Sequence, residues 1–311
     1  MPRSLDIDAL AAGVAQRAPR PLARAISLTE SGHPDARAVL AALPAGREAH
    51  IVGLTGPPGV GKSTTTSALV TTLRAAGRTV AVLAVDPSSP FTGGALLGDR
   101  VRMGEHATDS GVFIRSMAAR GHLGGLAAAV PQAVRLLEAA GFDLVLIETV
   151  GVGQSEVEIA RRADTCVVLL APGLGDGIQA AKAGILEIAD IFGVNKADRE
   201  GSEHTVSDLR TGIRLTARPT GAWRPTVISL SAQTGQGIAE LLAAIEEHRA
   251  HAQRTGTWQR RRAERAAAEV EALVLAAITG KVHHQVAARL ATGDGAASDP
   301  HTLAEQILTH W

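Results

Sequence analysis

A glycine-rich stretch that ends in Lys62 and Ser63 carries the clearest chemistry of the sequence. It follows the apolar run Ile51–Leu54 and precedes a helical pattern, which is the strand-loop-helix context of a phosphate-binding loop. Glycines let backbone N–H groups close around a phosphate, and the positive end of the next helix attracts the anion. We expect Lys62 to reach the β- and γ-phosphates and the Ser63 hydroxyl to ligate Mg²⁺; a chance glycine-rich turn is the alternative. The candidate loop comprises Gly56, Pro57, Pro58, Gly59, Val60, Gly61, Lys62, Ser63 and Thr64.

A second pattern, Asn195-Lys196-Ala197-Asp198, follows the apolar run that ends at Val194. An ionised Asp198 only accepts hydrogen bonds, so it can pair with N1–H and the exocyclic amine of guanine but not with the same edge of adenine. We expect the Lys196 stem to lie over the base and the Asn195 amide to brace the loops; an ordinary surface turn is the alternative. Farther along, backbone N–H groups of Ser231, Ala232 and Gln233 could contact the guanine carbonyl, although this element alone would be an ordinary loop.

Candidate metal and switch residues lie between these two patterns. Glu148 ends the apolar run Leu144–Ile147, and Gly151 lies three residues later, where its N–H could sense the γ-phosphate. Most GTPases have an aspartate at this position. The longer side chain of Glu148 can still organise a Mg²⁺-bound water, but the geometry of the site must differ. Asp86 ends another apolar run, and it or Asp99 could hold a metal-bound or attacking water. For Asp99, a loop acid paired with a neighbouring arginine is the alternative.

These residues require a fold that brings the ends of several strands to one edge. From His50 onward, short apolar runs alternate with amphipathic stretches, as in βαβ units around a parallel sheet that is buried on both faces. We therefore predict an α/β P-loop NTPase with a mostly parallel sheet flanked by helices. The predicted strands are 51–54, 80–85, 111–114, 144–147, 165–170, 188–194 and 226–229.

Two helical segments flank the α/β region. Apolar residues at helical spacing predict a helical N-terminal extension over residues 1–46, and the P-loop GTPase domain then covers 47–250. Residues 251–311 contain a long Ala/Arg/Glu/Leu pattern, a polar break and a final short helix. Such a tail cannot bury its apolar stripe alone, so it must fold back on the core or pair with another chain; we predict a helical dimerisation arm and a homodimer.

Composition narrows the partners and the location. The 31 basic and 31 acidic side chains give zero formal net charge, which argues against nucleic-acid and acidic-membrane binding. The apolar run 166–171 is far too short to span a membrane, and Asp6 and Asp8 argue against a secretory signal. We expect a cytoplasmic protein in which Cys166 is a buried, inert thiol.

Three blocks of sequence resemble the G-protein chaperones of methylmalonyl-CoA mutase, a family formerly described as arginine/ornithine transport ATPases or kinases. The blocks begin with the acid-and-proline segment at Asp86 and end with the glycine-rich segment after Glu148, and the second is far more specific than any general GTPase motif. The resemblance extends from about residue 20 to 250 and is looser beyond. The three blocks are 86–100, 113–126 and 148–156.

This resemblance implies a GTPase of the signal-recognition/MinD-related class, with GTP or GDP bound together with Mg²⁺. It assigns Lys62 to phosphate binding and Ser63 to phosphate and Mg²⁺ binding. It also implies that the chain gates the loading of cofactor onto an adenosylcobalamin-dependent acyl-CoA mutase and protects or reactivates this mutase. Arg115 and Arg120 are implied as residues that could neutralise charge. The metal and water residues would be Asp86, Asp99 and Glu148, and the switch or partner residues would be Gln154, Asp176, Gln179 and Lys182.

The resemblance also implies a third switch at the mutase interface, residues 172–182, for which a plain αβ connection is the alternative. This segment departs from the family pattern. Gly177-Ile178 stands where Glu-Leu is usual, and Ala180 stands where Gly is usual, so a Glu side chain has no role there. Two other functions stay open: a metallochaperone GTPase and a GTP-gated scaffold with negligible hydrolysis. The first needs a metal site, but no Cys/His cluster has metal-ligand spacing; His283-His284 is the only adjacent histidine pair and is expected on a solvated face.

Overall fold

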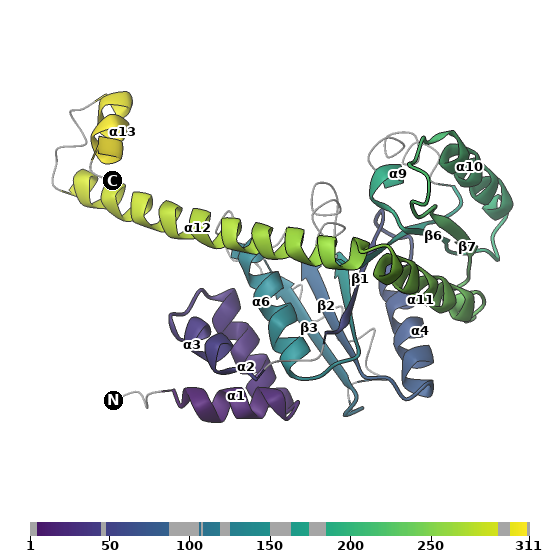
Figure 1. Ribbon diagram of the computed structural model, residues 1–311, viewed down its shortest axis with the longest axis horizontal. Helices are drawn as coiled ribbons and strands as arrows, with labels where there is room; N and C mark the ends of the chain where they lie inside the picture. Colours follow the sequence, from purple (N-terminus) through teal and green to yellow (C-terminus); the bar gives the residue numbers. More distant parts are fainter. Residues whose placement is uncertain are drawn as a thin grey trace. The chain divides into compact units, whose positions relative to one another are not determined.

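The computed structural model describes residues 5–44, 48–86, 106, 108–118, 125–149, 163–173, 185–291 and 299–309. The chain forms two compact units, Met1–Arg265 and Ala266–Trp311, and each is described by itself below. In the first unit, a parallel sheet lies between two layers of helices (Figure 1). The α/β architecture predicted from the alternating sequence pattern is confirmed.

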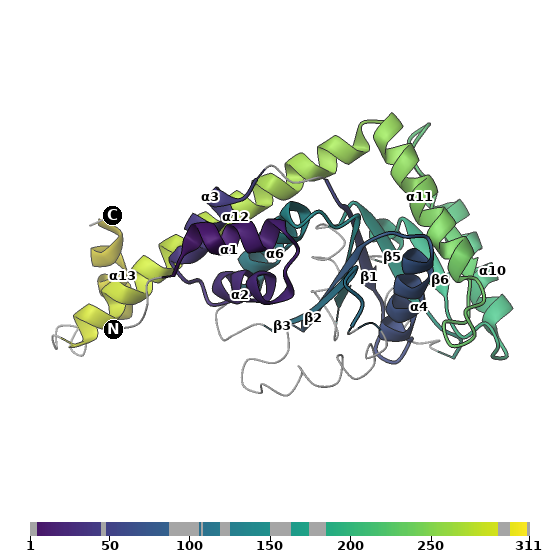
Figure 2. The same cartoon turned by 90° about the horizontal axis from the view of Figure 1, so that it is seen from below.

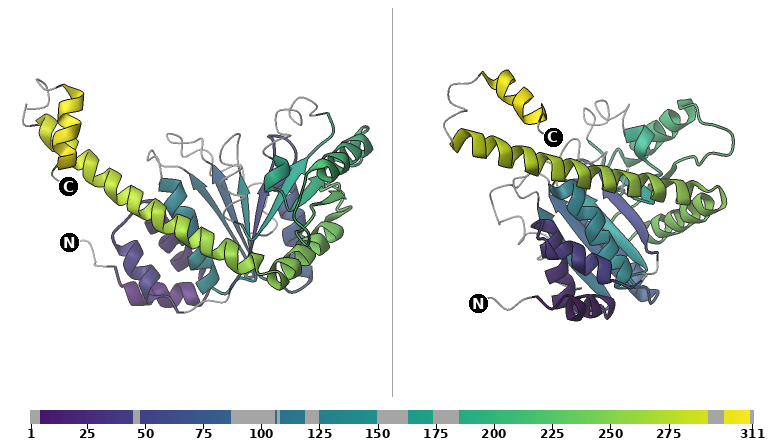
Figure 3. Two further views of the ribbon diagram at one scale, coloured as in Figure 1. Left: turned by 45° about the horizontal axis from the view of Figure 1, so that its top comes forward. Right: turned by 60° about the vertical axis from the view of Figure 1, so that its left-hand side comes forward.

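The sheet has seven parallel strands in the order β3-β2-β4-β1-β5-β6-β7, and Figure 3 (left) shows them side by side. All residues of β1, β4, β5 and β6 are buried, which explains their continuous apolar runs, whereas the edge strands β3 and β7 are mostly only partly buried. The sixth predicted run was wrong at its start, because Ile185–Ile188 forms the short helix α9 and the Asp190 carboxylate accepts from the Cys166 backbone N–H at 2.8 Å. The strands are β1 (His50–Thr55), β2 (Val80–Asp86), β3 (Val112–Ala118), β4 (Leu144–Thr149), β5 (Thr165–Leu170), β6 (Ile191–Val194) and β7 (Thr226–Ser229).

Alternating strand residues pack against two different helix layers. Figure 2 shows α6 and the N-terminal helices on one side of the sheet and α4 and α11 on the other. On one face, Ile51 and its in-plane neighbours pack on α6 (Gly125–Ala139) and the N-terminal helices, while α10 (Ser202–Leu215) covers β5 and β6. On the other face, Val52 and Leu54 pack on α4 (Lys62–Ala75) and α11 (Ile238–Arg254). The sheet is therefore held from both sides, as its sequence pattern requires.

The predicted helical extension forms three helices, α1 (Ile7–Ala15), α2 (Pro19–Glu30) and α3 (Asp35–Ala42). Arg17 lies between the first two and donates to the carbonyls of Ala140 and Gly141 at 3.1 and 2.7 Å, where it caps the C-terminus of α6. Its guanidinium also lies 4.7 Å from the Phe142 ring centroid. Arg115 on β3 pairs with Glu30 and donates to the Ser27 hydroxyl at 2.9 Å. The residue that resemblance nominated for charge neutralisation thus anchors the extension.

The C-terminal residues form α12 (Thr257–Ala291) and α13 (Pro300–Thr309). A turn at Thr255 and Gly256, which has φ +71°, separates α12 from α11. In the second unit, Arg289 donates to the Gln306 side chain at 3.0 Å, and His283 and His284 are exposed. Several large apolar side chains of α12 are also exposed: Val270, Leu273, Val274, Leu275 and Leu290.

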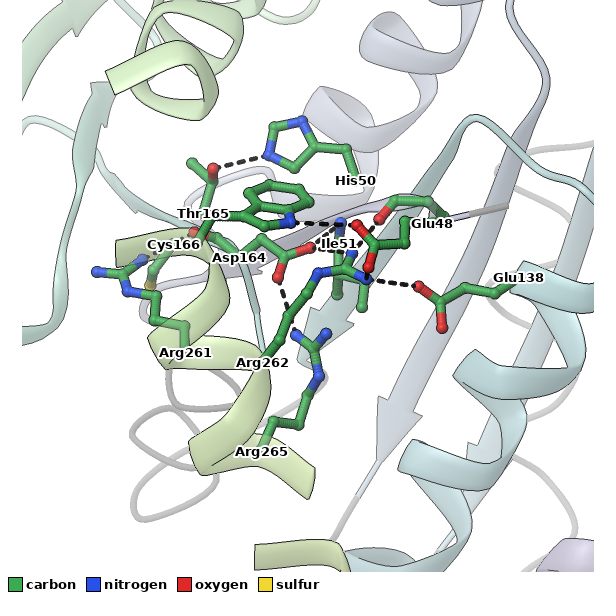
Figure 4. Close-up of polar contacts among 12 residues, drawn as sticks. Glu48, His50, Ile51, Glu138, Asp164, Thr165, Cys166, Arg261, Arg262 and Arg265 are labelled. Carbon is green, nitrogen blue, oxygen red and sulfur yellow. Dashed lines mark hydrogen bonds and ion pairs between the residues drawn. The ribbon is translucent and has the colours of Figure 1, made fainter. Parts of the chain in front are cut away.

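The first turns of α12 are fixed to the amino-terminal edge of the sheet by a cluster around Asp164, which precedes β5 (Figure 4). Its side chain is fully buried and accepts from Arg262 Nη2 at 3.0 Å, Arg265 Nη1 at 3.1 Å and the Ile51 backbone N–H at 3.0 Å. Arg262 also pairs with Glu138 at 3.3 Å. Burial raises the pKa of Glu138, and the nearby Arg262 opposes that rise. We call these residues the Asp164 cluster.

A buried hydrogen-bond chain lies beside this cluster. Asp190 binds Arg261 through both oxygens, at 2.7 and 2.8 Å, and lies 3.3 Å from Nε2 of His248. Burial raises the pKa of Asp190, but hydrogen bonds from Arg261 and His248 outweigh it and lower the pKa below its usual value. Thr165 Oγ1 lies 2.8 Å from both His248 Nδ1 and His50 Nε2. This chain links β1, β5, α11 and α12.

The direction of the chain follows from the carboxylate, which only accepts. A neutral His248 that donates to this carboxylate carries its proton on Nε2, so its Nδ1 accepts from the Thr165 hydroxyl, whose oxygen accepts from His50 Nε2–H. His50 Nδ1 is then a bare nitrogen, buried and without a hydrogen-bond partner among the described residues. Burial lowers the pKa of His50, and the positive charge of Arg249 lowers it further, with smaller effects of His248, Arg78 and Arg262.

Two further expectations can be compared with the fold. Cys166 is buried within β5, and this burial raises the pKa of its thiol, as expected for an inert cysteine. In the part of the chain that the structure describes, no helix is long and apolar enough to cross a membrane.

Candidate nucleotide-binding site

The glycine-rich loop connects β1 to α4, which begins at Lys62. Gly56 and Gly61 have φ of +143° and +95°, values that side chains with a Cβ rarely adopt. A Cβ on Gly56 would lie 2.2 Å from the Leu169 carbonyl oxygen of β5, and one on Gly61 would lie 2.4 Å from the Asn195 amide nitrogen. The two glycines therefore let the loop pass closely over the neighbouring strand ends.

Lys62 is mostly buried at the first position of α4, and its ammonium group lies within the loop. Nζ donates to the carbonyl of Gly56 at 2.6 Å and to that of Pro57 at 3.2 Å. These oxygens hold the positive charge beside the N-terminus of α4, where the helix dipole favours an anion. A phosphate group at this position would find a cation and helix N–H groups together.

Asn195 bridges the loop to a second loop that follows β7. Its side-chain nitrogen donates to the Val60 carbonyl at 2.7 Å, and its side-chain oxygen accepts from the Ala232 backbone N–H at 3.0 Å. The Asn195 side chain is buried, so the loss of either contact would leave a buried polar atom without its hydrogen bond. The three sequence patterns therefore meet at one amide side chain, at the carboxyl edge of the sheet where such folds bind ligands.

The neighbouring residues place one acceptor, the exposed Asp198 carboxylate, at the edge of the site. Lys196 has φ +60°, and its Nζ donates to the Gly59 carbonyl at 2.7 Å. A hydrogen bond from the Ser231 hydroxyl lowers the pKa of the exposed Asp198 carboxyl. Asp198 is therefore a carboxylate that can only accept, which is what a guanine edge requires. Ala232 is buried beside Asn195, whereas Gln233 is exposed.

Glu148 lies near the end of β4 and reaches the first turns of α4. Its Oε1 accepts from the Ser63 hydroxyl at 2.5 Å, and its Oε2 accepts from the Thr66 hydroxyl at 2.9 Å. A buried carboxylate beside a serine hydroxyl supplies the hard oxygen ligands that Mg²⁺ uses together with phosphate and water, so these residues fit that metal. Thr66 was not predicted from the sequence, although its spacing of three residues from Ser63 places both on one face of a helix.

The remaining predicted residues lie partly or wholly outside the described part of the chain. The backbone of Asp86 ends β2 at the same edge, but its side chain is outside the described part. The other candidates outside the described residues are Asp99, Gly151, Gln154, Asp176, Gln179 and Lys182, together with Arg120. The described site is therefore formed by the phosphate loop, Glu148, the Asn195 segment and the Ser231 segment.

Comparisons with known proteins agree with this geometry. A family model described as "Methylmalonyl Co-A mutase-associated GTPase MeaB" matches residues 22–287. A probable GTPase of Mycobacterium tuberculosis is 48% identical over 251 residues, which cover 78% of this chain and 75% of that one. The GTPase ArgK of Escherichia coli is 42% identical over 234 residues, which cover 72% and 70%.

Among solved structures, that of a LAO/AO transport system kinase matches with a TM-score of 0.71 at 28% identity, over 98% of this chain and 97% of that chain. The resemblance seen in the sequence blocks is thereby confirmed. The phosphate loop, the Asp198 acceptor and these relatives lead to one conclusion: the chain is a GTPase that hydrolyses GTP, and it belongs to the MeaB family of methylmalonyl-CoA mutase-associated GTPases.

Proposed function

We propose that this GTPase is a chaperone of an adenosylcobalamin-dependent acyl-CoA mutase of the methylmalonyl-CoA mutase type, for which it gates cofactor loading and which it protects or reactivates. The observation that carries the gating is the Asn195 bridge, because one side chain ties the phosphate loop to the loop after β7. The mutase as partner is supported by the family to which the chain belongs.

The nucleotide would use the residues that the sequence nominated. Backbone N–H groups of the loop from Gly56 to Thr64 and the Lys62 ammonium would bind the phosphates. Asp198 would accept from guanine. In the Ser231–Gln233 segment the Ser231 and Ala232 N–H groups already donate to Gln236 and Asn195, so the Gln233 N–H would contact the guanine carbonyl. Ser63 and Glu148, with Asp86 and Asp99, would hold Mg²⁺ and its water. The chemistry that Mg²⁺ would supply there is neutralisation of the negative charge on the phosphates.

Lys62 gives the site a means of responding to phosphate. Its ammonium now donates to the carbonyls of Gly56 and Pro57, and a phosphate oxygen is a stronger, charged acceptor. Binding would exchange these loop contacts for phosphate contacts. Glu148 and Asn195 contact Ser63 and Val60, which lie on either side of Lys62. A change in the Lys62 contacts would therefore affect β4 and the loop that carries Asn195. The segments proposed to report it are 86–99, 148–155 and 172–182, with Gly151, Gln154, Asp176, Gln179 and Lys182 as switch or partner residues.

The same proposal extends to the assembly. Residues 1–46 would form a helical extension, 47–250 the GTPase domain, and 251–311 a dimerisation arm in a cytoplasmic homodimer. The exposed apolar side chains of α12, Val270 and Leu275 among them, support a surface that a second copy covers. Light scattering of the full chain should then give twice the mass of one chain, and a monomer at micromolar concentration would contradict this part.

The chaperone role is tested with a purified methylmalonyl-CoA mutase. Its affinity for the full-length GTPase should differ between GDP and a non-hydrolysable GTP analogue, and it should accelerate GTP turnover. Lys62→Ala should abolish both effects, whereas Lys281→Ala, an exposed lysine of α12, serves as a control for loss of one charge. Equal affinity in both nucleotide states, with no change in turnover, would contradict the proposal.

A further inference from the structure

Thr66 lies two residues beyond the predicted phosphate loop and is fully buried. A helical threonine commonly returns its hydroxyl to the carbonyl four residues earlier, as Thr65 does to Gly61 at 2.9 Å. Thr66 instead donates across to Oε2 of Glu148 at 2.9 Å. Its hydroxyl therefore supports another element rather than its own helix.

Glu148 has one more side-chain torsion than the aspartate usual at this position, so its carboxylate has more freedom to rotate. The two hydroxyls remove that freedom, because Ser63 binds Oε1 and Thr66 binds Oε2. Ser63 and Thr66 are three residues apart on α4, so both hydroxyls lie on the face toward β4. The carboxylate is held at both oxygens by one rigid helix.

We propose that Thr66 is a positioning residue for the metal-organising carboxylate: it retains Oε2 of Glu148 and so keeps Oε1 directed at the Ser63 hydroxyl. This inference rests on the proposed Mg²⁺ site at Ser63 and Glu148. In that site Ser63 would give its oxygen to the metal, and its proton would remain directed at Oε1. By holding Oε2, Thr66 would fix the orientation of the Glu148 carboxylate, so that the longer side chain can take the place of the usual aspartate.

A merely structural role makes a different prediction from a positioning role. If Thr66 only satisfied a buried carboxylate, its loss would destabilise the protein and weaken GDP binding equally with and without Mg²⁺. If it positions Glu148, the loss appears in the part of GDP affinity that Mg²⁺ adds. The quantity to measure is therefore the ratio of the GDP dissociation constant in EDTA to that in saturating Mg²⁺.

The full-length protein should be titrated with GDP by calorimetry in both conditions. Thr66→Val, which keeps the size and removes the hydroxyl, should lower the ratio about tenfold, because it removes a hydrogen bond to a charged group. Thr66→Ser should restore most of it. Thr72→Val is the matched control, since the Thr72 hydroxyl donates only to the Ala68 carbonyl on the same helix, at 2.9 Å, and its ratio should equal that of wild type.

Two results would overturn the inference, and they differ. A large wild-type ratio that Thr66→Val leaves unchanged, because the two affinities either stay the same or fall equally, would refute the role of Thr66 alone. A wild-type ratio near one would refute the proposed Mg²⁺ site and the role of Thr66 with it. Thermal unfolding of the variants in EDTA shows separately whether each one is folded.

Discussion

Asp164→Asn should test how strongly the start of α12 is attached to the sheet. The substitution preserves the size of the side chain and removes its charge at a position with no solvent exposure. Arg262 and Arg265, whose side chains are 16% and 13% exposed, would then face an amide instead of a carboxylate. One amide hydrogen-bond donor would have to point toward a guanidinium group, because asparagine has only one acceptor oxygen.

The magnitude follows from the partners that remain. Breaking a buried ion pair by removing one partner costs about 3–5 kcal/mol. The asparagine oxygen can still accept from the Ile51 N–H, and Arg262 keeps Glu138 at 3.3 Å and the Ala49 carbonyl at 2.6 Å. We therefore expect the low end of that range, a loss of about 3 kcal/mol in the free energy of unfolding.

Urea unfolding measures this loss. Trp258 is a suitable fluorescent probe, because the Arg262 guanidinium lies 4.6 Å from the centroid of its ring and the side chain is buried. Coincident fluorescence and circular dichroism curves would allow a free energy to be extracted. Asp208→Asn, at an exposed position of α10, is the control and should change stability by less than about 0.5 kcal/mol. A loss below about 1 kcal/mol for Asp164→Asn would refute the reasoning, because a loss that small is what an ion pair on the solvent-exposed surface contributes.

Three other predictions concern the nucleotide site and the buried histidine. Asp198→Asn should shift preference from guanosine toward xanthosine nucleotides in a competition assay, and an unchanged preference would contradict the base assignment. Glu148→Asp should lower the Mg²⁺-dependent part of GDP affinity about tenfold, because the shorter side chain cannot keep both hydroxyl contacts; equal affinity would show that the extra length is not used. Because the pKa of His50 is below its usual value of 6.5, the unfolded state binds more protons and stability should fall as the pH drops below 6.5; His50→Gln should remove part of that slope in urea titrations at several pH values.

The sequence predicts the sheet and the phosphate loop well because both leave a local signature. A strand that is buried on both faces must be apolar along its whole length, so β1, β4 and β5 appear as continuous runs. The loop glycines occur in one short stretch because the phosphate site is built from consecutive backbone groups. The position of the Asn195 pattern at the end of a strand could also be predicted, because the pattern directly follows an apolar run.

The Asp164 cluster has no such signature. Asp164 precedes a strand and resembles an ordinary turn residue, while the arginines of residues 260–265 resemble a solvated helix face. These residues meet only in the folded chain, because they lie far apart in the sequence: the bond from Arg261 Nη1 to the Asp164 carbonyl joins residues 97 positions apart. Thr66 was equally hidden, because a run of serine and threonine does not reveal which hydroxyl turns away from its own helix.

The two polar sites share the strands on which they are built. β1 carries His50 and Ile51 at its amino end, where the Asp164 cluster lies, and Thr55 at its carboxyl end, just before the phosphate loop. It pairs with β4 on one side and β5 on the other, and both of its faces are covered. The strand therefore connects the two sites directly: the Asp164 cluster contacts its first residues, and the phosphate loop begins one residue after its last. A substitution at either end acts on a strand that also contributes to the other site, so variants of the Asp164 cluster should be assayed for nucleotide affinity as well as for stability.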